Sequence, residues 1–210
     1  MERINLTPDT TLAVARLAAE VILAGGIVLH PTDTVYGLAG DATQRAVASR
    51  MAQLKQRPED MPFIVLMANP GMLHAWIGGL TNTQALIIDR CAPGPVTFML
   101  PGTVRTRDFS GTGGTIAVRI PDHEFTVALC RESGVPILST SANTHGASTP
   151  TTCDAVESAI GDHVDLIVVG TCNSGDVSTM LDLTRETPRI VREGAMSRSE
   201  LEQRIGLNVL

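Results

Sequence analysis

The sequence is poor in aromatic residues, which make up 3% of its 210 positions and include one Trp and one Tyr. Proteins that bind single-stranded nucleic acid commonly stack bases on aromatic side chains and attract the phosphate backbone with a basic surface. The second feature is missing too, because the net charge is -6 at pH 7. The composition therefore disfavours a standalone RNA-binding protein.

Metal-binding patterns are also absent from the sequence. The 4 cysteines lie at 91, 130, 153 and 172 without paired C-x-x-C spacing, and the 5 histidines form no metal-spaced pair on a helix. We therefore expect reduced thiols and no metal site made by protein side chains.

Long apolar runs do not occur. No stretch approaches the roughly 20 residues that a membrane span needs, and the opening MERINLTPDT has no apolar signal-peptide core. We expect a cytoplasmic protein without membrane contact. At 43% hydrophobic composition, residues 1–210 are expected to form a single domain.

The common nucleotide and nucleophile signatures are missing as well. The sequence has no G-x-x-x-x-G-K-S/T phosphate loop, no G-x-G-x-x-G after a strand and no G-x-S-x-G nucleophile elbow. Any nucleotide chemistry must therefore use a different set of residues.

What the chain does contain is an alternation of amphipathic helices and short apolar strands, which predicts an α/β fold. Helices are predicted from about Thr7 to Gly25, over Thr43–Leu54 and around Thr83–Cys91. Strands are predicted at Ile27–Leu29, Phe63–Met67, Val96–Leu100, Thr115–Ile120, Pro136–Ser139, Leu166–Val169, Thr179–Leu183 and Arg189–Arg192.

Polar residues follow two of these strands directly, in the segments HPTDTVYG (residues 30–37) and STSAN (residues 139–143). In open α/β sheets, ligands collect at the carboxyl ends of strands, and hydroxyl and amide groups can bind phosphate or ribose without adding charge repulsion. Each segment has a structural alternative: the first an ordinary Thr/Asp turn, the second the start of an Asn-capped helix.

Two cations stand close together in Lys55-Gln56-Arg57-Pro58. Because a residue before proline favours extended geometry, the two side chains are expected to face one side, as a polyphosphate site would need. The alternative is a solvated helix end whose cations complement the helix dipole.

Arg119 lies in a strand that alternates, with Ile116 and Val118 on one face and the small Thr115 and Ala117 beside the arginine on the other. An arginine in so apolar a strand needs an anionic partner. That partner is either an internal Asp or Glu or the carboxylate of a ligand.

The segments HPTDTVYGLAGDA, LKQRPEDMPF, PGPVTFML, IAVRIPDH, PILSTSAN and STMLDL…RIVREGA together resemble, in the same order, the YrdC-like threonylcarbamoyl-AMP synthase family. The resemblance runs from about Leu17 to Ala195 and is similar to the short, single-domain form. It implies a twisted, largely open mixed sheet flanked by helices, with a concave ligand-binding face.

The resemblance also implies an activity, the synthesis of threonylcarbamoyl-AMP and pyrophosphate from L-threonine, bicarbonate and ATP. The product would serve the N6-threonylcarbamoyladenosine modification next to the tRNA anticodon. The implied cofactor is Mg²⁺ bound with ATP. The implied partners are a downstream threonylcarbamoyl transferase complex and, through a weak contact, tRNA.

Site residues are carried over by the same resemblance. It implies that Lys55 and Arg57 act in catalysis. The threonine pocket would contain Thr32, Tyr36, Arg119, Ser139 and Thr179. The ATP site would contain Lys55, Arg57, Thr115, Ser141, Asn143 and Arg192. Arg119 would then pair with the carboxylate of threonine, not with an internal acid.

The chain departs from the family pattern at two positions. Leu66 stands where many members have a substrate-facing histidine, so we expect Leu66 to face the amino acid and to weaken its polar contacts. Glu193 stands where a proline commonly separates the arginine and glycine of the last motif. Two other functions compete with the synthase: a related carbamoyl-adenylate enzyme, and a non-catalytic RNA-binding or ribosome-associated module.

Overall fold

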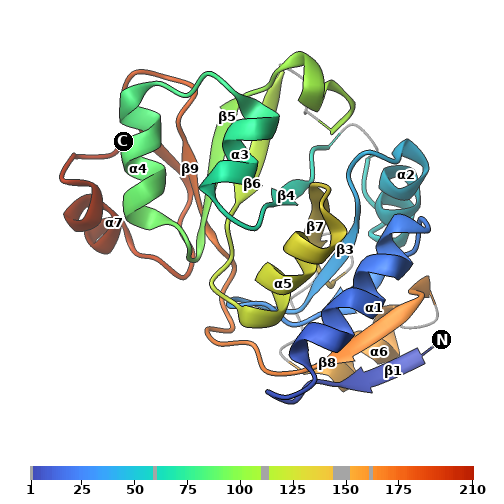
Figure 1. Cartoon of the computed structure of the whole chain (residues 1–210). Coiled ribbons are helices and arrows are strands. Elements are labelled where there is room, and N and C mark those ends of the chain that lie inside the picture. The colour runs from blue at the N-terminus through green and yellow to red at the C-terminus, as the bar shows by residue number, and fades with distance from the viewer. Residues whose placement is uncertain (1, 59–60, 110–113, 144–151, 161–162) are drawn as a thin grey trace.

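The structure, a computed structural model, describes residues 2–58, 61–109, 114–143, 152–160 and 163–210. These residues contain one 10-stranded sheet with the strand order β1-β8-β2-β3-β7-β4-β6-β5-β9-β10 (Figure 1). The strands are β1 (Glu2–Asn5), β2 (Val28–His30), β3 (Gly37–Asp41), β4 (Ile64–Leu66), β5 (Val96–Pro101), β6 (Thr115–Arg119), β7 (Ile137–Ser141), β8 (Leu166–Val169), β9 (Thr179–Asp182) and β10 (Arg189–Arg192).

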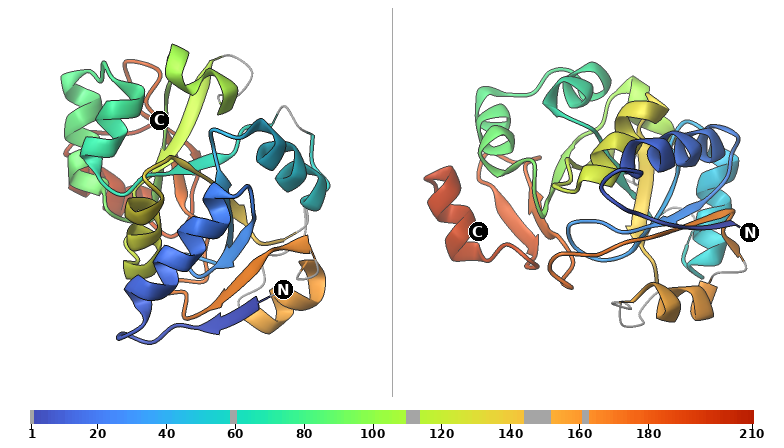
Figure 2. Two further views of the ribbon diagram at one scale, coloured as in Figure 1. Left: turned by 45° about the vertical axis from the view of Figure 1, so that its right-hand side comes forward. Right: turned by 60° about the horizontal axis from the view of Figure 1, so that its bottom comes forward.

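Helices cover both faces of this sheet. Helices α1 and α5 lie side by side on one face, and α6 lies on the opposite face (Figure 2). The helices are α1 (Thr11–Leu23), α2 (Arg45–Leu54), α3 (Pro70–Ile77), α4 (Asn82–Cys91), α5 (Glu124–Ser133), α6 (Cys153–Ile160) and α7 (Arg198–Ile205), with a 3-10 helix η1 (Val104–Phe109).

Two apolar clusters form the core, one on each face of the sheet. The pleat sends Leu29 to one cluster and Val28 to the other, which is why these two successive residues of β2 are both apolar. In the second cluster, Ala18 of α1 and Phe125 of α5 are both almost fully buried, and these two helices pack against each other. Burying a side chain such as Phe125 stabilises the fold by about 1.5–3 kcal/mol.

Strand register places polar side chains on one face near the middle of the sheet. Leu66 of β4 lies opposite Arg119 of β6, and Ile64 of β4 lies opposite Ser139 of β7. Residues directly opposite in register share a face. Parallel β4–β6 and antiparallel β4–β7 pairing thus bring segments far apart in sequence to one location.

The predicted fold class is confirmed, since the sheet is mixed and open and is flanked by helices. The predicted start of the first helix was wrong. Residues 7–10 form a turn, in which the Thr7 amide donates to the Thr10 hydroxyl, and α1 begins at Thr11. No range was predicted for seven of the elements: β1, β3, α3, α5, α6, α7 and η1. Strand β3, with the sequence GLAGD, contains two glycines and no β-branched residue, so local propensity does not indicate it.

Two expectations from composition can be compared with the structure. The cysteines are free thiols, with Cys91, Cys130 and Cys153 buried and Cys172 half-buried. Within the described ranges, no helix has both the length and the apolar character that a bilayer crossing would require.

Candidate functional site

A pocket of about 390 Å³ lies at the sheet face where β4, β6 and β7 meet. Four cationic side chains line it, together with hydroxyl and amide groups, and no Asp or Glu belongs to its described lining. The cations are Lys55, Arg57, Arg119 and Arg192. A chain with a net charge of -6 thus has a local cationic cavity suited to an anionic ligand.

The K-x-R segment enters the pocket through the end of α2. Lys55 is the C-cap residue, with φ -76 and ψ -10, and Gln56 is left-handed, with φ 52. The amide of Gln56 donates to the Gln53 carbonyl and that of Arg57 to the Ala52 carbonyl, which is the hydrogen-bond pattern of a Schellman motif.

The segment is therefore not extended as predicted, because Lys55 is helical and Gln56 is left-handed. The expectation that the two cations face one side was nevertheless right. Both Lys55 and Arg57 line the pocket, because the left-handed turn at Gln56 redirects the chain after the helix. Sequence reasoning relied on the proline at 58, but the helix end decides the path. A non-glycine residue with positive φ is uncommon and costs about 1 kcal/mol or more.

Lys55 is buried, and its ammonium group is held by the end of β7. Nζ donates to the Ser141 carbonyl at 2.6 Å and to Asn143 Oδ1 at 2.8 Å. Burial, and secondarily the charge of Arg57, lowers the pKa of Lys55 to about 8. Two of its three N–H bonds thus meet protein acceptors within the described residues, and the third is available to a ligand.

Arg57 is half-buried and stacks on the ring of Phe63, with the guanidinium carbon 3.8 Å from the ring centroid. One of its terminal nitrogens donates to the Met61 carbonyl, while its buried Nε has no hydrogen-bond partner among the described residues. Burial lowers the pKa of this guanidinium. The stacking fixes the plane of the fork, which is the orientation that recognition of phosphate requires.

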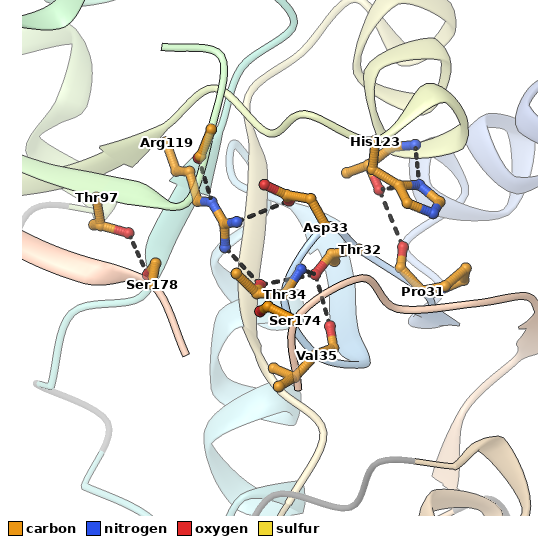
Figure 3. A network of polar contacts seen from close by, with 12 residues as sticks. Pro31, Thr32, Asp33, Thr34, Val35, Thr97, Arg119, His123, Ser174 and Ser178 are labelled. Carbon is orange, nitrogen blue, oxygen red and sulfur yellow. Dashed lines mark hydrogen bonds and ion pairs between the residues drawn. The ribbon is translucent and has the colours of Figure 1, made fainter. Parts of the chain in front are cut away.

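Arg119 forms an ion pair with an internal acid, which corrects the expectation that only a ligand would neutralise it. Its Nη2 lies 2.7 Å from Asp33 Oδ1, and both side chains are buried. Nη1 donates to the Thr34 hydroxyl at 2.8 Å and Nε to the Gly94 carbonyl at 3.2 Å (Figure 3). Burial lowers the pKa of Arg119, and the Asp33 carboxylate opposes that effect.

The ion pair leaves part of the guanidinium available. Despite the short distance, Nη2 and both oxygens of Asp33 lack a hydrogen-bond partner of good geometry among the described residues. Asp33 therefore balances the charge of Arg119 without saturating its donors. The two alternatives considered for Arg119, an internal acid and a ligand carboxylate, are compatible in this arrangement.

The HPTDTVYG segment forms a tight hydroxyl-bonded turn beside the pocket. Thr32 Oγ1 donates to the Val35 carbonyl at 2.7 Å and accepts from the Thr34 amide at 3.0 Å (Figure 3). Tyr36 donates its hydroxyl to the Gly170 carbonyl and accepts from the Gly170 amide at 3.0 Å, so its ring is fixed in the wall. Burial raises the pKa of Tyr36 to about 12.

The STSAN segment also lines the pocket. Ser141 donates to Asn143 Oδ1 at 2.6 Å, so this one oxygen accepts from both Ser141 and Lys55. Arg192, at the end of β10, is another lining residue and donates to the Ser178 carbonyl at 2.8 Å. Lys55, Arg57 and Arg192 are therefore held by carbonyl and amide oxygens of the described residues, whereas the carboxylate of Asp33 balances the charge of Arg119.

A protein family with a known sequence pattern matches most of this chain. Residues 20–194 match the Sua5/YciO/YrdC family model, which is described as telomere recombination.

The chain belongs to the Sua5/YciO/YrdC family.

Two curated relatives named threonylcarbamoyl-AMP synthase support this membership. The one from Pyrococcus abyssi is 34% identical over 193 residues, which cover 91% of this chain and 57% of that protein. The one from Shigella flexneri is 37% identical over 160 residues, which cover 75% of this chain and 82% of that protein. The chain thus spans little more than half of the Pyrococcus relative.

A solved structure of a family member has the same fold. Pyrococcus abyssi Sua5, crystallised with L-threonine, superposes with a TM-score of 0.90 at 31% identity. The match covers 100% of this chain and 62% of that chain. The chain therefore has the fold of the part of that structure which it matches.

The pocket gathers most of the site residues that the family resemblance implied. Its lining includes Thr32, Tyr36, Lys55, Arg57, Arg119, Ser139, Ser141, Asn143 and Arg192. Leu66, expected to face the substrate, also lines it. Thr115 and Thr179 are not part of the described lining.

Thr179 is fully buried, and its hydroxyl already forms hydrogen bonds with backbone groups of this chain. Its hydroxyl donates to the Met196 carbonyl and accepts from the amide of Gly194 at 2.9 Å and from that of Met196 at 3.2 Å. Thr179 therefore fixes the turn that follows Arg192, and it is Ser178 and Met180 on either side that reach the pocket.

Sequence reasoning missed several lining residues. Thr34, Thr140 and Ser178 add hydroxyls, and Val35, Ile64 and Met180 add apolar walls. Position gives a usable signal for Thr34 and Thr140, because both lie inside segments already singled out. Ser178 likewise opens the STMLDL segment, directly before the strand β9 that pairs with β5.

Proposed function

We propose that this chain synthesises threonylcarbamoyl-AMP from L-threonine, bicarbonate and ATP. The observation that carries this proposal is the pocket itself, in which cations face a cavity of about 390 Å³ without a carboxylate in its described lining. Such a lining fits a ligand pair that brings several negative charges, namely an amino acid carboxylate and a triphosphate. The names of the two curated relatives support the same activity.

The proposed reaction requires no protein nucleophile. The threonine amine and bicarbonate give a carbamate and water. A carbamate oxygen then attacks the α-phosphorus of ATP, the bond from that phosphorus to the bridging oxygen breaks, and pyrophosphate leaves. The protein's contribution is to hold the two reactants in line, to neutralise the charge on the phosphates and to exclude water from a labile product.

The residue roles are those that the family resemblance implies, and the presence of these residues in the pocket lining supports them. Arg119, whose Nη2 has no hydrogen-bond partner of good geometry among the described residues, would bind the threonine carboxylate. Lys55 and Arg57 would take the phosphates and stabilise the charge that develops on the leaving pyrophosphate. Further contacts to threonine would come from Thr32, Tyr36 and Ser139, and further contacts to ATP from Ser141, Asn143 and Arg192.

Mg²⁺ would enter with ATP and would be held mainly by phosphate oxygens and water. The described lining contains no carboxylate, and the described residues contain no cluster of three His, Cys, Asp or Glu side chains placed to hold a metal ion. This is the usual mode of Mg²⁺ in nucleotide sites. The ion would supply charge neutralisation, and no residue of the chain is assigned to it.

The proposed partners follow from the product. A carbamoyl adenylate is labile, so we propose that a downstream threonylcarbamoyl transferase complex consumes it and modifies tRNA. No observation in the described residues favours the RNA-binding module or the related carbamoyl-adenylate enzyme over this function.

The experiment that tests the proposal is pyrophosphate release from ATP by the intact chain. Release should require both bicarbonate and an amino acid, and across a panel of amino acids it should be greatest with L-threonine. Release that ignores the amino acid, or salt-dependent RNA binding without any turnover, would reject the synthase assignment.

A further inference from the structure

His30 is a fully buried histidine with one unpaired ring nitrogen. Its Nδ1 lies 3.0 Å from the Pro31 carbonyl. Because a carbonyl can only accept, Nδ1 carries the proton, and Nε2 of the neutral ring is left as an acceptor. That Nε2 is buried and has no hydrogen-bond partner among the described residues.

The ring is neutral and well fixed. Burial, together with a smaller effect of the nearby His123, lowers the pKa of His30 to about 4, although the bond to the Pro31 carbonyl opposes both. The ring of Phe125 lies 6.1 Å away, centroid to centroid, on the α5 side. The Pro31 carbonyl also accepts from the Thr126 hydroxyl at 3.1 Å, so α5 fixes the same group that orients the imidazole.

Gly37 separates this nitrogen from the pocket. His30 and Gly37 are paired across β2 and β3, and Gly37 and Ser141 across β3 and β7, so the three residues form one row on the sheet. A Cβ at position 37 would lie 3.4 Å from His30 Nε2, from Ser139 Oγ and from the Thr140 carbonyl. Gly37, Ser139 and Thr140 all line the pocket, so the absent side chain opens a polar niche between the pocket and Nε2.

Every polar atom around this niche can accept a hydrogen bond. His30 Nε2 and the Thr140 carbonyl are acceptors only, and the Ser139 hydroxyl can also donate. The charged groups of the pocket, by contrast, are cationic donors. The two kinds of group therefore divide the pocket into a part for anionic oxygens and an inner part for N–H or O–H groups.

We propose that His30 recognises the amino-acid substrate by accepting, through Nε2 across Gly37, a hydrogen bond from an N–H or O–H group of that substrate, directly or through one ordered water. The inference rests on the proposed function for the identity of the substrate as an amino acid. A buried acceptor left unpaired is costly, so a donor supplied by the ligand gains more here than at an exposed site.

Two matched variants test this role. In His30→Gln the side-chain oxygen can reach the place of Nε2, whereas in His30→Asn the amide can keep the bond to Pro31 but leaves the niche without its acceptor. We expect His30→Asn to raise the KM for L-threonine about fivefold, the loss expected for one neutral hydrogen bond, and His30→Gln to restore it. The KM for ATP should stay the same in both variants.

Gly37→Ala provides a test from the other side of the niche. Its φ does not lie in the left-handed region and the added methyl would meet its neighbours at 3.4 Å, so the variant should fold while the methyl covers Nε2. It should raise the KM for threonine as His30→Asn does.

The amino acid 2-aminobutyrate, which lacks the hydroxyl of threonine, identifies the donor group. With this substrate, the increase in KM caused by His30→Asn disappears if the hydroxyl is the donor and persists if the donor is the amine.

The outcomes separate this inference from the function on which it rests. If the wild-type chain shows no threonine-dependent pyrophosphate release, the proposed function fails and the inference fails with it. If the wild type is active but His30→Asn leaves the KM for threonine unchanged, or both His30 variants raise it equally, only the inference fails. Should His30→Asn not fold, the ¹⁵N shift of Nε2 in the wild type decides: saturating threonine must move it, and no movement overturns the proposal.

Discussion

Arg119 and Asp33 form a buried ion pair at the wall of the pocket, with 2.7 Å between Nη2 and Oδ1 and with 7% and 5% of the two side chains exposed. Breaking such a pair on one side leaves an uncompensated buried charge, which typically costs about 3–5 kcal/mol. Arg119, which is proposed to bind the substrate, therefore also contributes to the stability of the fold.

We predict that Asp33→Ala and Arg119→Ala each lower the free energy of unfolding by about 3–5 kcal/mol, and that the double variant loses less than the sum of the two. Denaturant unfolding curves measure this. Glu200→Ala, which breaks the exposed pair of Glu200 with Arg204, is the control and should cost less than about 0.5 kcal/mol. Additive losses in the double variant would mean that the two side chains do not interact.

Lys55 and Arg57 are predicted to act on turnover. Replacing either by alanine removes a charge-assisted contact to phosphate, and each change should reduce kcat/KM for ATP by roughly tenfold to a hundredfold. Pyrophosphate release measures the effect. Arg45→Ala, at an exposed position on the same helix, is the matched control and should behave as wild type. Normal rates of pyrophosphate release in both pocket variants would mean that the K-x-R segment is only the end of a helix and does not bind phosphate.

The lowered pKa of Lys55 predicts a pH limit. With the pKa at about 8, the free enzyme loses this cation as the pH rises above 8, so kcat/KM for ATP should fall by about tenfold per pH unit. In Lys55→Arg the charge persists at alkaline pH because arginine titrates above about pH 12. The fall of kcat/KM above pH 8 should therefore be absent from that variant. An unchanged fall would mean that another group titrates.

His30 predicts a loss of stability in acid. Its pKa is about 4 in the folded chain and near 6.5 in the unfolded chain, so the unfolded state binds the extra proton between these values. Stability from this group is complete above pH 6.5 and declines as the pH falls towards 4, by about 3 kcal/mol in total. In His30→Gln this contribution should vanish, leaving the dependence that comes from His123, whose pKa is also lowered by burial. Equal acid slopes in the two proteins would mean that His30 is not buried neutral.

Thr179→Val tests a residue that the resemblance placed in the threonine pocket and the structure places in a turn. The change removes the acceptor of two backbone amides, at Gly194 and Met196, and should destabilise the fold by about 1–3 kcal/mol. Because this turn follows Arg192, the KM for ATP should rise more than that for threonine. A rise confined to threonine would restore the original assignment.

The sequence by itself determined the fold class and most of the pocket. Apolar runs of three to five residues between amphipathic helices indicate an α/β sheet, and polar residues at the ends of those runs mark the ligand edge. The family resemblance then assigned Thr32, Ser141 and Arg119, which come from separate segments, to the ligand site. Local periodicity carries this information, because burial on one face or both leaves a pattern in the residues themselves.

Only the tertiary structure decided which groups neutralise and orient one another. The Asp33 partner of Arg119 comes from another strand end, 86 positions earlier in the chain, and the small neighbours of Arg119 in its own strand gave no sign of it. The left-handed Gln56, the occupied hydroxyl of Thr179 and the niche between His30 and Gly37 likewise depend on strand register and helix ends. Such contacts are set by pairing between distant segments, and single-sequence patterns do not encode that pairing locally.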